Sequence, residues 1–155
     1  MRVIFLDFDG VVNAHEWIHL RSGPKIMQRQ ARMLQIIIDK TGANLVVSST
    51  WSSMILSGDM TKRGFERMLK THGIRAEVLD ALPVVKQVSP NESAAHRSSL
   101  ITGWLAACRD DAAGQPDRYI VIDDLAIRGH PLIRTNPAVG LEPRHVSQAI
   151  GLLVG

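Results

Sequence analysis

The feature that most constrains this chain is an apolar run near its start that ends abruptly in two carboxylates. Val3-Ile4-Phe5-Leu6 is followed directly by Asp7-Phe8-Asp9-Gly10. An unbroken apolar run of this length is typical of a strand buried on both faces, as in a parallel sheet. Such a strand has no use for charge, and the carboxyl ends of parallel strands open onto the ligand crevice. We therefore expect Asp7 and Asp9 to face a functional site.

Alternating strand and helix patterns predict the rest of the fold. Further strands are expected at 45–47, 76–79, 119–122 and 132–134, and apolar helix faces at 27–38, 61–72, 100–108 and after Pro143. The segments 14–25 and 80–93 are predicted to be irregular. This order predicts an α/β fold in which helices cover both faces of a mainly parallel sheet. The 155 residues suffice to bury a core, and we expect a single domain over 1–155.

The composition limits the setting in which the chain works. Cys108 is the only cysteine, so the chain can form no internal disulfide, which favours a reducing, cytoplasmic location. No apolar run approaches the roughly 20 residues that span a bilayer, and the N-terminus lacks a secretory signal pattern. We therefore expect no membrane partner.

A small excess of positive charge leaves a nucleic-acid partner open without identifying one. The chain has 18 Lys and Arg against 15 Asp and Glu, a formal charge of +3. Five of the bases share one segment: Lys62, Arg63, Arg67, Lys70 and Arg75. A solvated helix face explains this cluster more simply than a stripe that binds a nucleic-acid backbone, which is the less favoured interpretation.

Polar side chains also follow two of the later predicted strands. Ser48 and Ser49 come after the strand at 45–47, and Asp123 and Asp124 come after the strand at 119–122. If these strands end at the same sheet edge as the first, four carboxylates and two hydroxyls share one crevice. That much negative charge requires a cation. Oxygen ligands without histidine or thiolate favour Mg²⁺.

These segments, taken in order, resemble the four motifs of the haloacid dehalogenase (HAD) superfamily. They are Asp7-Phe8-Asp9-Gly10-Val11-Val12, the strand ending at Ser48, a basic residue opening a later helix, and Val121-Ile122-Asp123-Asp124. Further segments are similar to the HAD domain of Swiss Army Knife RNA repair proteins, namely Ser48-Ser49-Thr50-Trp51, His96-Arg97 with Ile101 and Trp104-Leu105, and Gly140-Leu141. The resemblance implies a Rossmann-like three-layer sandwich. The short insertions after the first two strands imply little or no cap.

The resemblance also implies an activity and assigns the acids to roles. It implies a Mg²⁺-dependent phosphomonoester hydrolase that forms an aspartyl-phosphate. Asp7 is the expected nucleophile, and Asp9 the general acid and then the base. Two carboxylates at i and i+2 of an extended strand point the same way, which suits these two roles. The expected metal ligands are Asp7, the main-chain carbonyl of Asp9, and Asp124, with Asp123 as the alternative to Asp124.

The phosphate itself needs partners that are not acids. Ser48 is expected to hydrogen-bond the phosphoryl oxygens, with help from Ser49. A fixed cation is also required, because the transferring group carries spread negative charge. Arg97 is the favoured cation, at the start of the helix that precedes the Asp123 strand, with Lys86 and His96 as competitors. An open crevice favours a large phosphorylated substrate such as a nucleotide or a polynucleotide end over a small metabolite.

Two other functions stay open at this point. One is a HAD-like domain that binds phosphate or nucleic acid without turnover. The other is a zinc metallohydrolase, because His15-Glu16-Trp17-Ile18-His19 spells the H-E-x-x-H pattern. That pattern needs a long helix, whereas Ser22-Gly23-Pro24 breaks the segment soon afterwards. We therefore regard the zinc function as remote, and expect His15 and its neighbours to overhang the site.

Overall fold

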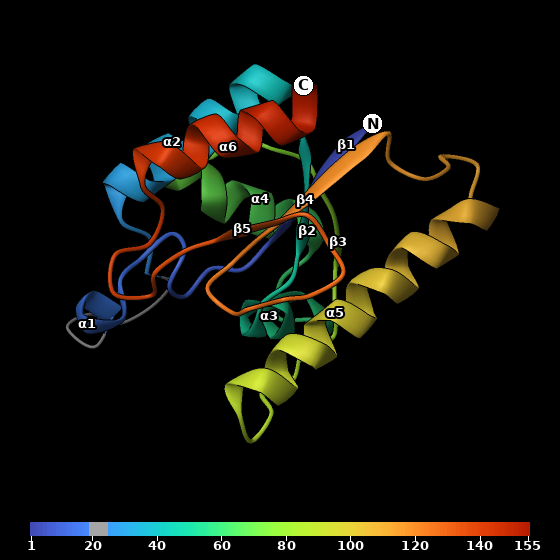
Figure 1. The fold of residues 1–155 in the computed structure, drawn as a ribbon, viewed down its shortest axis with the longest axis horizontal. Helices are drawn as coiled ribbons and strands as arrows, with labels where there is room; N and C mark the ends of the chain where they lie inside the picture. The colour runs from blue at the N-terminus through green and yellow to red at the C-terminus, as the bar shows by residue number, and fades with distance from the viewer. Residues whose placement is uncertain (19–24) are drawn as a thin grey trace.

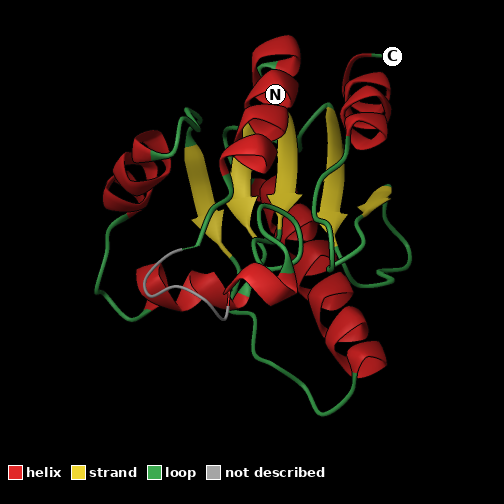
Figure 2. Cartoon of the chain, turned by 90° about the vertical axis from the view of Figure 1, so that its left-hand side faces the viewer, coloured by secondary structure: helices red, strands yellow, loops and turns green. Residues whose placement is uncertain are grey.

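The computed structural model of the protein describes residues 1–18 and 25–155. The described residues form a five-stranded sheet in the order β3-β2-β1-β4-β5, with every neighbouring pair parallel (Figure 2). The strands are β1 (Arg2–Leu6), β2 (Asn44–Val47), β3 (Val78–Ala81), β4 (Arg118–Asp123) and β5 (Leu132–Arg134). Because β1 lies at the centre, it is buried between β2 and β4. The first apolar run is therefore a buried strand of a parallel sheet, as predicted.

Helices cover both faces of the sheet (Figure 1). They are α1 (His15–Ile18), α2 (Gln28–Thr41), α3 (Ser53–Leu56), α4 (Lys62–Thr71), α5 (Pro90–Ala107) and α6 (Pro143–Val154), with short 3-10 turns at Thr50–Ser52 and Cys108–Asp110. Helices α2, α4 and α6 pack on one face, and α5 packs on the other. The structure is thus the predicted Rossmann-like three-layer α/β sandwich. No helix among the described residues is long and apolar enough to cross a membrane.

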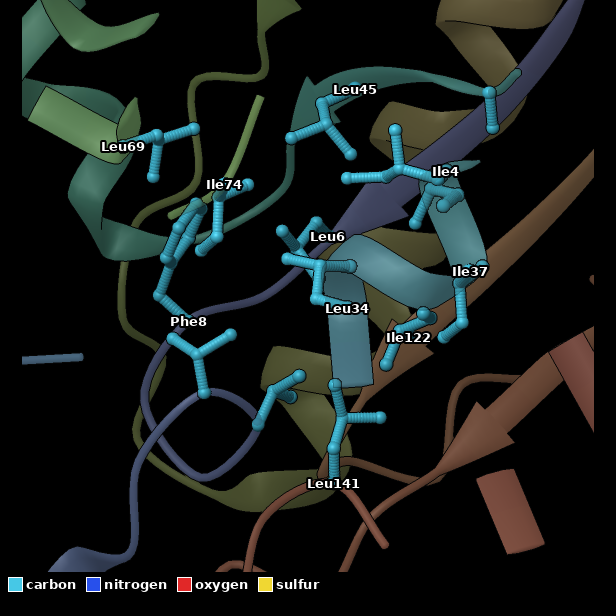
Figure 3. Packing of buried hydrophobic residues seen from close by; sticks show 14 of the residues in the cluster. Ile4, Leu6, Phe8, Leu34, Ile37, Leu45, Leu69, Ile74, Ile122 and Leu141 are labelled. Carbon is cyan, nitrogen blue, oxygen red and sulfur yellow. The ribbon is translucent and has the colours of Figure 1, made fainter. Parts of the chain in front are cut away.

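The side chains of β1 alternate between two apolar clusters, one on each face of the sheet. Ile4 and Leu6 belong to the larger cluster with α2, where Leu34 and Ile37 lie against them (Figure 3). Phe5 belongs to the smaller cluster beneath α5. Burying each such side chain stabilises the fold by roughly 1.5–3 kcal/mol. This packing holds the central strand, and with it the acids at its carboxyl end.

Aromatic packing fixes the turn that follows β1. The ring of Phe8 stacks on the indole of Trp51 with ring centroids 4.6 Å apart, and meets Phe65 edge to face at 5.6 Å. Because Phe8 lies between Asp7 and Asp9, its burial orients both carboxylates. The contact with Trp51 also ties the turn after β1 to the turn after β2. The Phe and Trp of the two motifs are therefore structural neighbours of the site.

The two segments predicted to be irregular are wrong in part. Residues 80–81 belong to β3 and residues 90–93 to α5, so the segment 80–93 is irregular only in its middle. Helix α5 begins at Pro90 because the Ser89 side chain accepts a hydrogen bond from the backbone of Glu92, and proline suits the first turn. Within 14–25, residues 15–18 form the short helix α1, and residues 19–24 lie outside the described part.

Candidate active site

The acids of the first motif occupy a tight, buried turn. Asp7 donates its backbone N–H to the Ile122 carbonyl at 2.9 Å, which continues the pairing of β1 with β4. Its Oδ1 accepts a hydrogen bond from the backbone N–H of Phe8, also at 2.9 Å. Gly10 adopts φ 80°, and a Cβ there would lie 2.8 Å from Oδ2 of Asp124. The glycine of the motif is therefore required by both its backbone angle and its contact with the second acid pair.

Three of the predicted acids form one cluster. Asp7, Asp123 and Asp124 each offer a carboxylate oxygen within 4.8 Å of the others, and they come from the ends of β1 and β4. Asp7 and Asp123 are buried, whereas Asp124 is partly exposed. The carboxylate of Asp9 is not a member of this cluster, because its Oδ1 accepts a hydrogen bond from Asn13 instead. The sequence predicts that four carboxylates share one cluster. The structure brings three of them together, and Asp9 lines the cleft beside them.

Arg97 reaches the acid cluster from α5, which packs on the face of the sheet away from α2. Its Nη1 lies 3.0 Å from Oδ2 of Asp7 and 2.7 Å from Oδ2 of Asp123. The prediction that Arg97 opens a helix is wrong, because α5 begins at Pro90 and places Arg97 within its interior. The side chain nevertheless reaches the acids, since this part of α5 packs against the sheet. One guanidinium therefore bridges the acids that follow β1 and β4.

The cluster holds more negative charge than Arg97 balances. Burial raises the pKa of Asp7 well above its ordinary value, and the charge of Asp123 raises it further, although Arg97 opposes both. Burial likewise raises the pKa of Asp123 to about 6, against the opposing effect of Arg97. Crowded carboxylates of this kind favour either protons or a bound cation.

The hydroxyls after β2 occupy different surroundings. Ser48 is fully buried, and its Oγ has no hydrogen-bond partner among the described residues. Ser49 caps the following 3-10 turn, where its Oγ accepts from the backbone N–H of Trp51 at 3.1 Å. Thr50, the next residue of this hydroxyl-rich segment, lines the cleft. Nε of Arg97 is likewise buried without a partner. This Nε belongs to the same guanidinium that pairs with Asp7 and Asp123, whereas Ser48 is not among the residues that line the cleft.

An open cleft of about 320 Å³ lies above the acids. Its walls include Asp7, Asp9, Asp124 and Arg97. Lys86, a competing candidate for the phosphate-binding cation, also lines this cleft. His96, the other candidate, is not among the lining residues, and its Nε2 accepts a hydrogen bond from the backbone N–H of Val85 at 3.1 Å. The cleft therefore presents Arg97 and Lys86, while His96 supports the adjoining loop.

Asn13 is a site residue that sequence reasoning missed. It is fully buried, and its Nδ2 donates to Oδ1 of Asp9 at 3.0 Å and to the Lys25 carbonyl at 2.8 Å. Its Oδ1 accepts from the backbone N–H of Gly10 at 2.9 Å. An asparagine just after an Asp-Gly turn is a signal for such bonding, since its short amide readily reaches nearby backbone groups.

The H-E-x-x-H pattern lies only partly within the described residues. His15 and Glu16 begin α1, Glu16 is exposed, and His19 lies outside the described part. His15 lines the cleft, with its Nε2 3.7 Å from Oδ2 of Asp124. This placement agrees with the expectation that His15 overhangs the site.

The comparisons with known proteins identify the family. A family model described as the HAD domain in Swiss Army Knife RNA repair proteins matches residues 3–146, a range that holds every candidate residue named above. The chain belongs to this family. Neither the comparison with curated proteins nor the comparison with solved structures found a match. The predicted resemblance of the sequence motifs to this HAD domain is thus confirmed.

The donors of this HAD domain suit the metal that its superfamily uses. Asp7, Asp123 and Asp124 supply oxygen ligands within 4.8 Å of one another, and a single arginine faces them. Hard oxygen donors and uncompensated negative charge fit Mg²⁺, which takes one or two carboxylates and completes its shell with water and phosphate oxygens. The open cleft leaves room for both. The residues present therefore fit a magnesium site.

Proposed function

We propose that this HAD domain is a Mg²⁺-dependent phosphomonoester hydrolase that works through an aspartyl-phosphate on Asp7. The observation that carries the proposal is the acid cluster of Asp7, Asp123 and Asp124, to which Arg97 is paired while its Nε is buried without a partner. Carboxylates that would bind a cation thus lie next to a donor that lacks an acceptor. A phosphoryl group with its metal ion satisfies both sets at once.

In the first step, a carboxylate oxygen of Asp7 attacks the phosphorus atom of the substrate. The bond between phosphorus and the leaving oxygen breaks, and Asp9 donates a proton to that oxygen. Ser48 and Arg97 hold the phosphoryl oxygens by donating hydrogen bonds. Ser49, whose oxygen accepts from Trp51, keeps its hydroxyl hydrogen for the same purpose.

In the second step, Asp9 accepts a proton from water as the water oxygen attacks the phosphorus atom. The bond between phosphorus and Asp7 breaks, which releases inorganic phosphate and restores the carboxylate. Asp7, Asp124 and the main-chain carbonyl of Asp9 would hold the magnesium ion, while Asp123 orients Arg97. When bound, the ion supplies positive charge that offsets the charge of the phosphoryl group.

The substrate proposed is a phosphorylated nucleotide or nucleic-acid end. The matched family comes from RNA repair proteins, and the cleft lies open at the carboxyl ends of the strands. A small metabolite usually needs a lid that excludes water, whereas a polynucleotide end needs an open approach. A cytoplasmic location stays a prediction.

A panel of phosphorylated compounds tests this function. Phosphate release is measured with Mg²⁺ and with chelator, from an aryl phosphate, sugar phosphates, nucleotides, and 3′- and 5′-phosphorylated RNA and DNA oligonucleotides. We expect turnover only with Mg²⁺, highest with nucleic-acid ends, and its loss in both Asp7→Asn and Asp9→Asn. The exposed Glu16 gives the control, since Glu16→Gln should leave turnover intact.

Three results would contradict the proposal. Binding of oligonucleotides without turnover would support a non-catalytic domain. Activity that requires zinc and is lost only in Glu16→Gln would support the metallohydrolase function. A preference for sugar phosphates would retain the hydrolase and exclude the nucleic-acid end.

A further inference from the structure

One wall of the cleft is built from a single continuous loop. Residues 85–90 all line it, between β3 and the body of α5. In Figure 1 this segment projects at the lower edge of the molecule, where it leads into the start of α5. Figure 2 shows it on the same side as the strand arrowheads, which is the side of the acids. We call residues 83–89 the recognition loop.

The recognition loop is braced against α5. The backbone N–H of Val85 donates to Nε2 of His96 at 3.1 Å, and the backbone N–H of Gln87 donates to Oγ of Ser93 at 3.2 Å. The side chain of Gln87 also donates to the Val85 carbonyl at 3.0 Å. These bonds fix the backbone on both sides of Lys86. A loop that is already ordered loses little conformational entropy when it binds a ligand.

Lys86 carries a charge that nothing in the site uses. It is exposed, lines the cleft, and makes no hydrogen bond or ion pair with any residue that the structure describes. Arg97, by contrast, already pairs with Asp7 and Asp123. The scissile phosphate has Arg97 and Ser48 beside the nucleophile. Lys86, held on a separate loop, is therefore available for a second anionic group of the substrate.

Apolar side chains flank this lysine. Val85 is 61% exposed and Val88 is 97% exposed, both on the cleft wall. Exposed valines on a braced loop offer an apolar surface without the need for rearrangement. Next to a lone cation, they suit a substrate that presents an apolar face close to a negative charge.

From this arrangement we infer that the recognition loop binds the nucleotide next to the scissile phosphate, with Lys86 on its internucleotide phosphate and the valines against its base or sugar. The inference rests on the proposed function and narrows it to an oligonucleotide end rather than a mononucleotide. A mononucleotide carries no second phosphate for Lys86. The formal charge of +3 suits a polyanionic partner, and a phosphopeptide is tested below as the alternative.

Comparing turnover of a longer and a shorter substrate tests the inference. The ratio of kcat/KM for a phosphorylated oligonucleotide to kcat/KM for the matching mononucleotide is measured for the wild type and three variants. Lys86→Gln should lower this ratio about 5- to 10-fold, and Val88→Ser about 2- to 3-fold, because each removes one contact with the adjacent nucleotide. Lys40→Gln, an equal change at an exposed position on the last turn of α2, should leave the ratio unchanged.

Salt dependence supplies an independent measurement. In a protein carrying Asp7→Asn to stop turnover, the oligonucleotide Kd is followed by fluorescence anisotropy as salt increases. Adding Lys86→Gln should reduce the slope of log affinity against log salt by about 0.7, the value for one phosphate contact on a single strand. Lys40→Gln should not change the slope.

The outcomes separate the inference from the proposed function. Loss of turnover in Asp7→Asn together with an unchanged ratio in Lys86→Gln overturns the role of the loop and leaves the hydrolase. Retained turnover in Asp7→Asn overturns the hydrolase itself. If Lys86→Gln weakens turnover of a phosphopeptide but not of oligonucleotides, the partner is a protein and the inference is wrong.

Discussion

The side-chain amide of Asn13 donates a hydrogen bond to Oδ1 of Asp9 over 3.0 Å. The same nitrogen donates to the Lys25 carbonyl, and the amide oxygen accepts from the backbone of Gly10. Asn13 thus joins Asp9 and Gly10, in the turn after β1, to the segment that precedes α2. Its contact with one carboxylate oxygen of Asp9 leaves the other for the cleft. We infer that Asn13 positions the carboxylate that is proposed as the general acid.

Replacing Asn13 tests this positioning role. Asn13→Ala should lower kcat for an aryl phosphate about 10-fold or more with little change in KM, because Asp9 loses its fixed orientation. It should also reduce the free energy of unfolding by about 2–3 kcal/mol, since the Gly10 N–H is left without its acceptor in a buried turn. Kinetics and urea unfolding measure the two effects. Asn91→Ala, at an exposed position, is the control, and an unchanged kcat in Asn13→Ala would remove the positioning role.

Removing one charge from the acid cluster should stabilise the metal-free protein. Asp124→Asn relieves repulsion between carboxylates within 4.8 Å of one another, so the free energy of unfolding in chelator should rise by on the order of 1 kcal/mol, and Tm with it. The same change removes a proposed magnesium ligand, and Mg²⁺ should no longer raise Tm. Thermal unfolding with and without Mg²⁺ measures both. Asp59→Asn, an exposed control, should alter neither, and a full Mg²⁺ response in Asp124→Asn would exclude Asp124 as a ligand.

The position of the acids could be predicted because it follows from strand order. Asp7 and Asp123 each end a buried apolar run, and in a parallel sheet such ends share one edge. The structure brings these two acids together with Asp124. The side-chain contacts within the cluster depend on rotamers and turns, so the separate position of the Asp9 carboxylate was not predictable from spacing alone.

Arg97 shows why part of the site was mispredicted. Its helix was expected to begin near His96, whereas Ser89-Pro90-Asn91-Glu92 starts α5 almost two turns earlier. That segment has the Ser-x-x-Glu pattern of a capping box, a start signal that the sequence carried and that apolar periodicity alone missed. The missed turns place Ser93 and the end of the recognition loop on the cleft wall.

Arg97 should be required for stability as well as for phosphate binding. Arg97→Met leaves Asp7 and Asp123 buried without their partner and should reduce the free energy of unfolding by about 3–5 kcal/mol in chelator. Arg97→Lys keeps the charge and should lose less. Adding Asp123→Asn to Arg97→Met should recover part of the loss, because the two residues interact directly. Urea unfolding of the wild type, Arg97→Met, Asp123→Asn and the double variant measures the coupling, and fully additive losses would contradict the pairing.

His145 should make stability depend on pH through a group outside the acid cluster. It is buried in the first turn of α6, and its Nδ1 accepts from the backbone N–H of Glu142 at 3.0 Å, so the neutral ring fits the fold. Burial lowers the pKa of His145 in the folded state, and Arg144 lowers it further, although Glu142 opposes. Between that lowered pKa and the unfolded value of about 6.5, the unfolded chain binds more protons than the folded one. Stability should therefore fall as pH decreases through about 6.5, and level off below the folded-state pKa.

Comparing the wild type with His145→Gln separates the pH dependence that His145 causes from the pH dependence of the acids in the site. His145→Gln removes the titrating ring, so the free energy of unfolding of the wild type minus that of His145→Gln should fall as pH decreases through about 6.5. His72→Gln, at a half-buried position with no side-chain hydrogen bond to a described residue, should give the same pH curve as the wild type. Urea unfolding at a series of pH values gives the curves. Because Asp7 and Asp123 titrate alike in all three proteins, their opposite pH dependence cancels in the difference. Parallel curves for the wild type and His145→Gln would show that His145 is protonated equally in the folded and unfolded states.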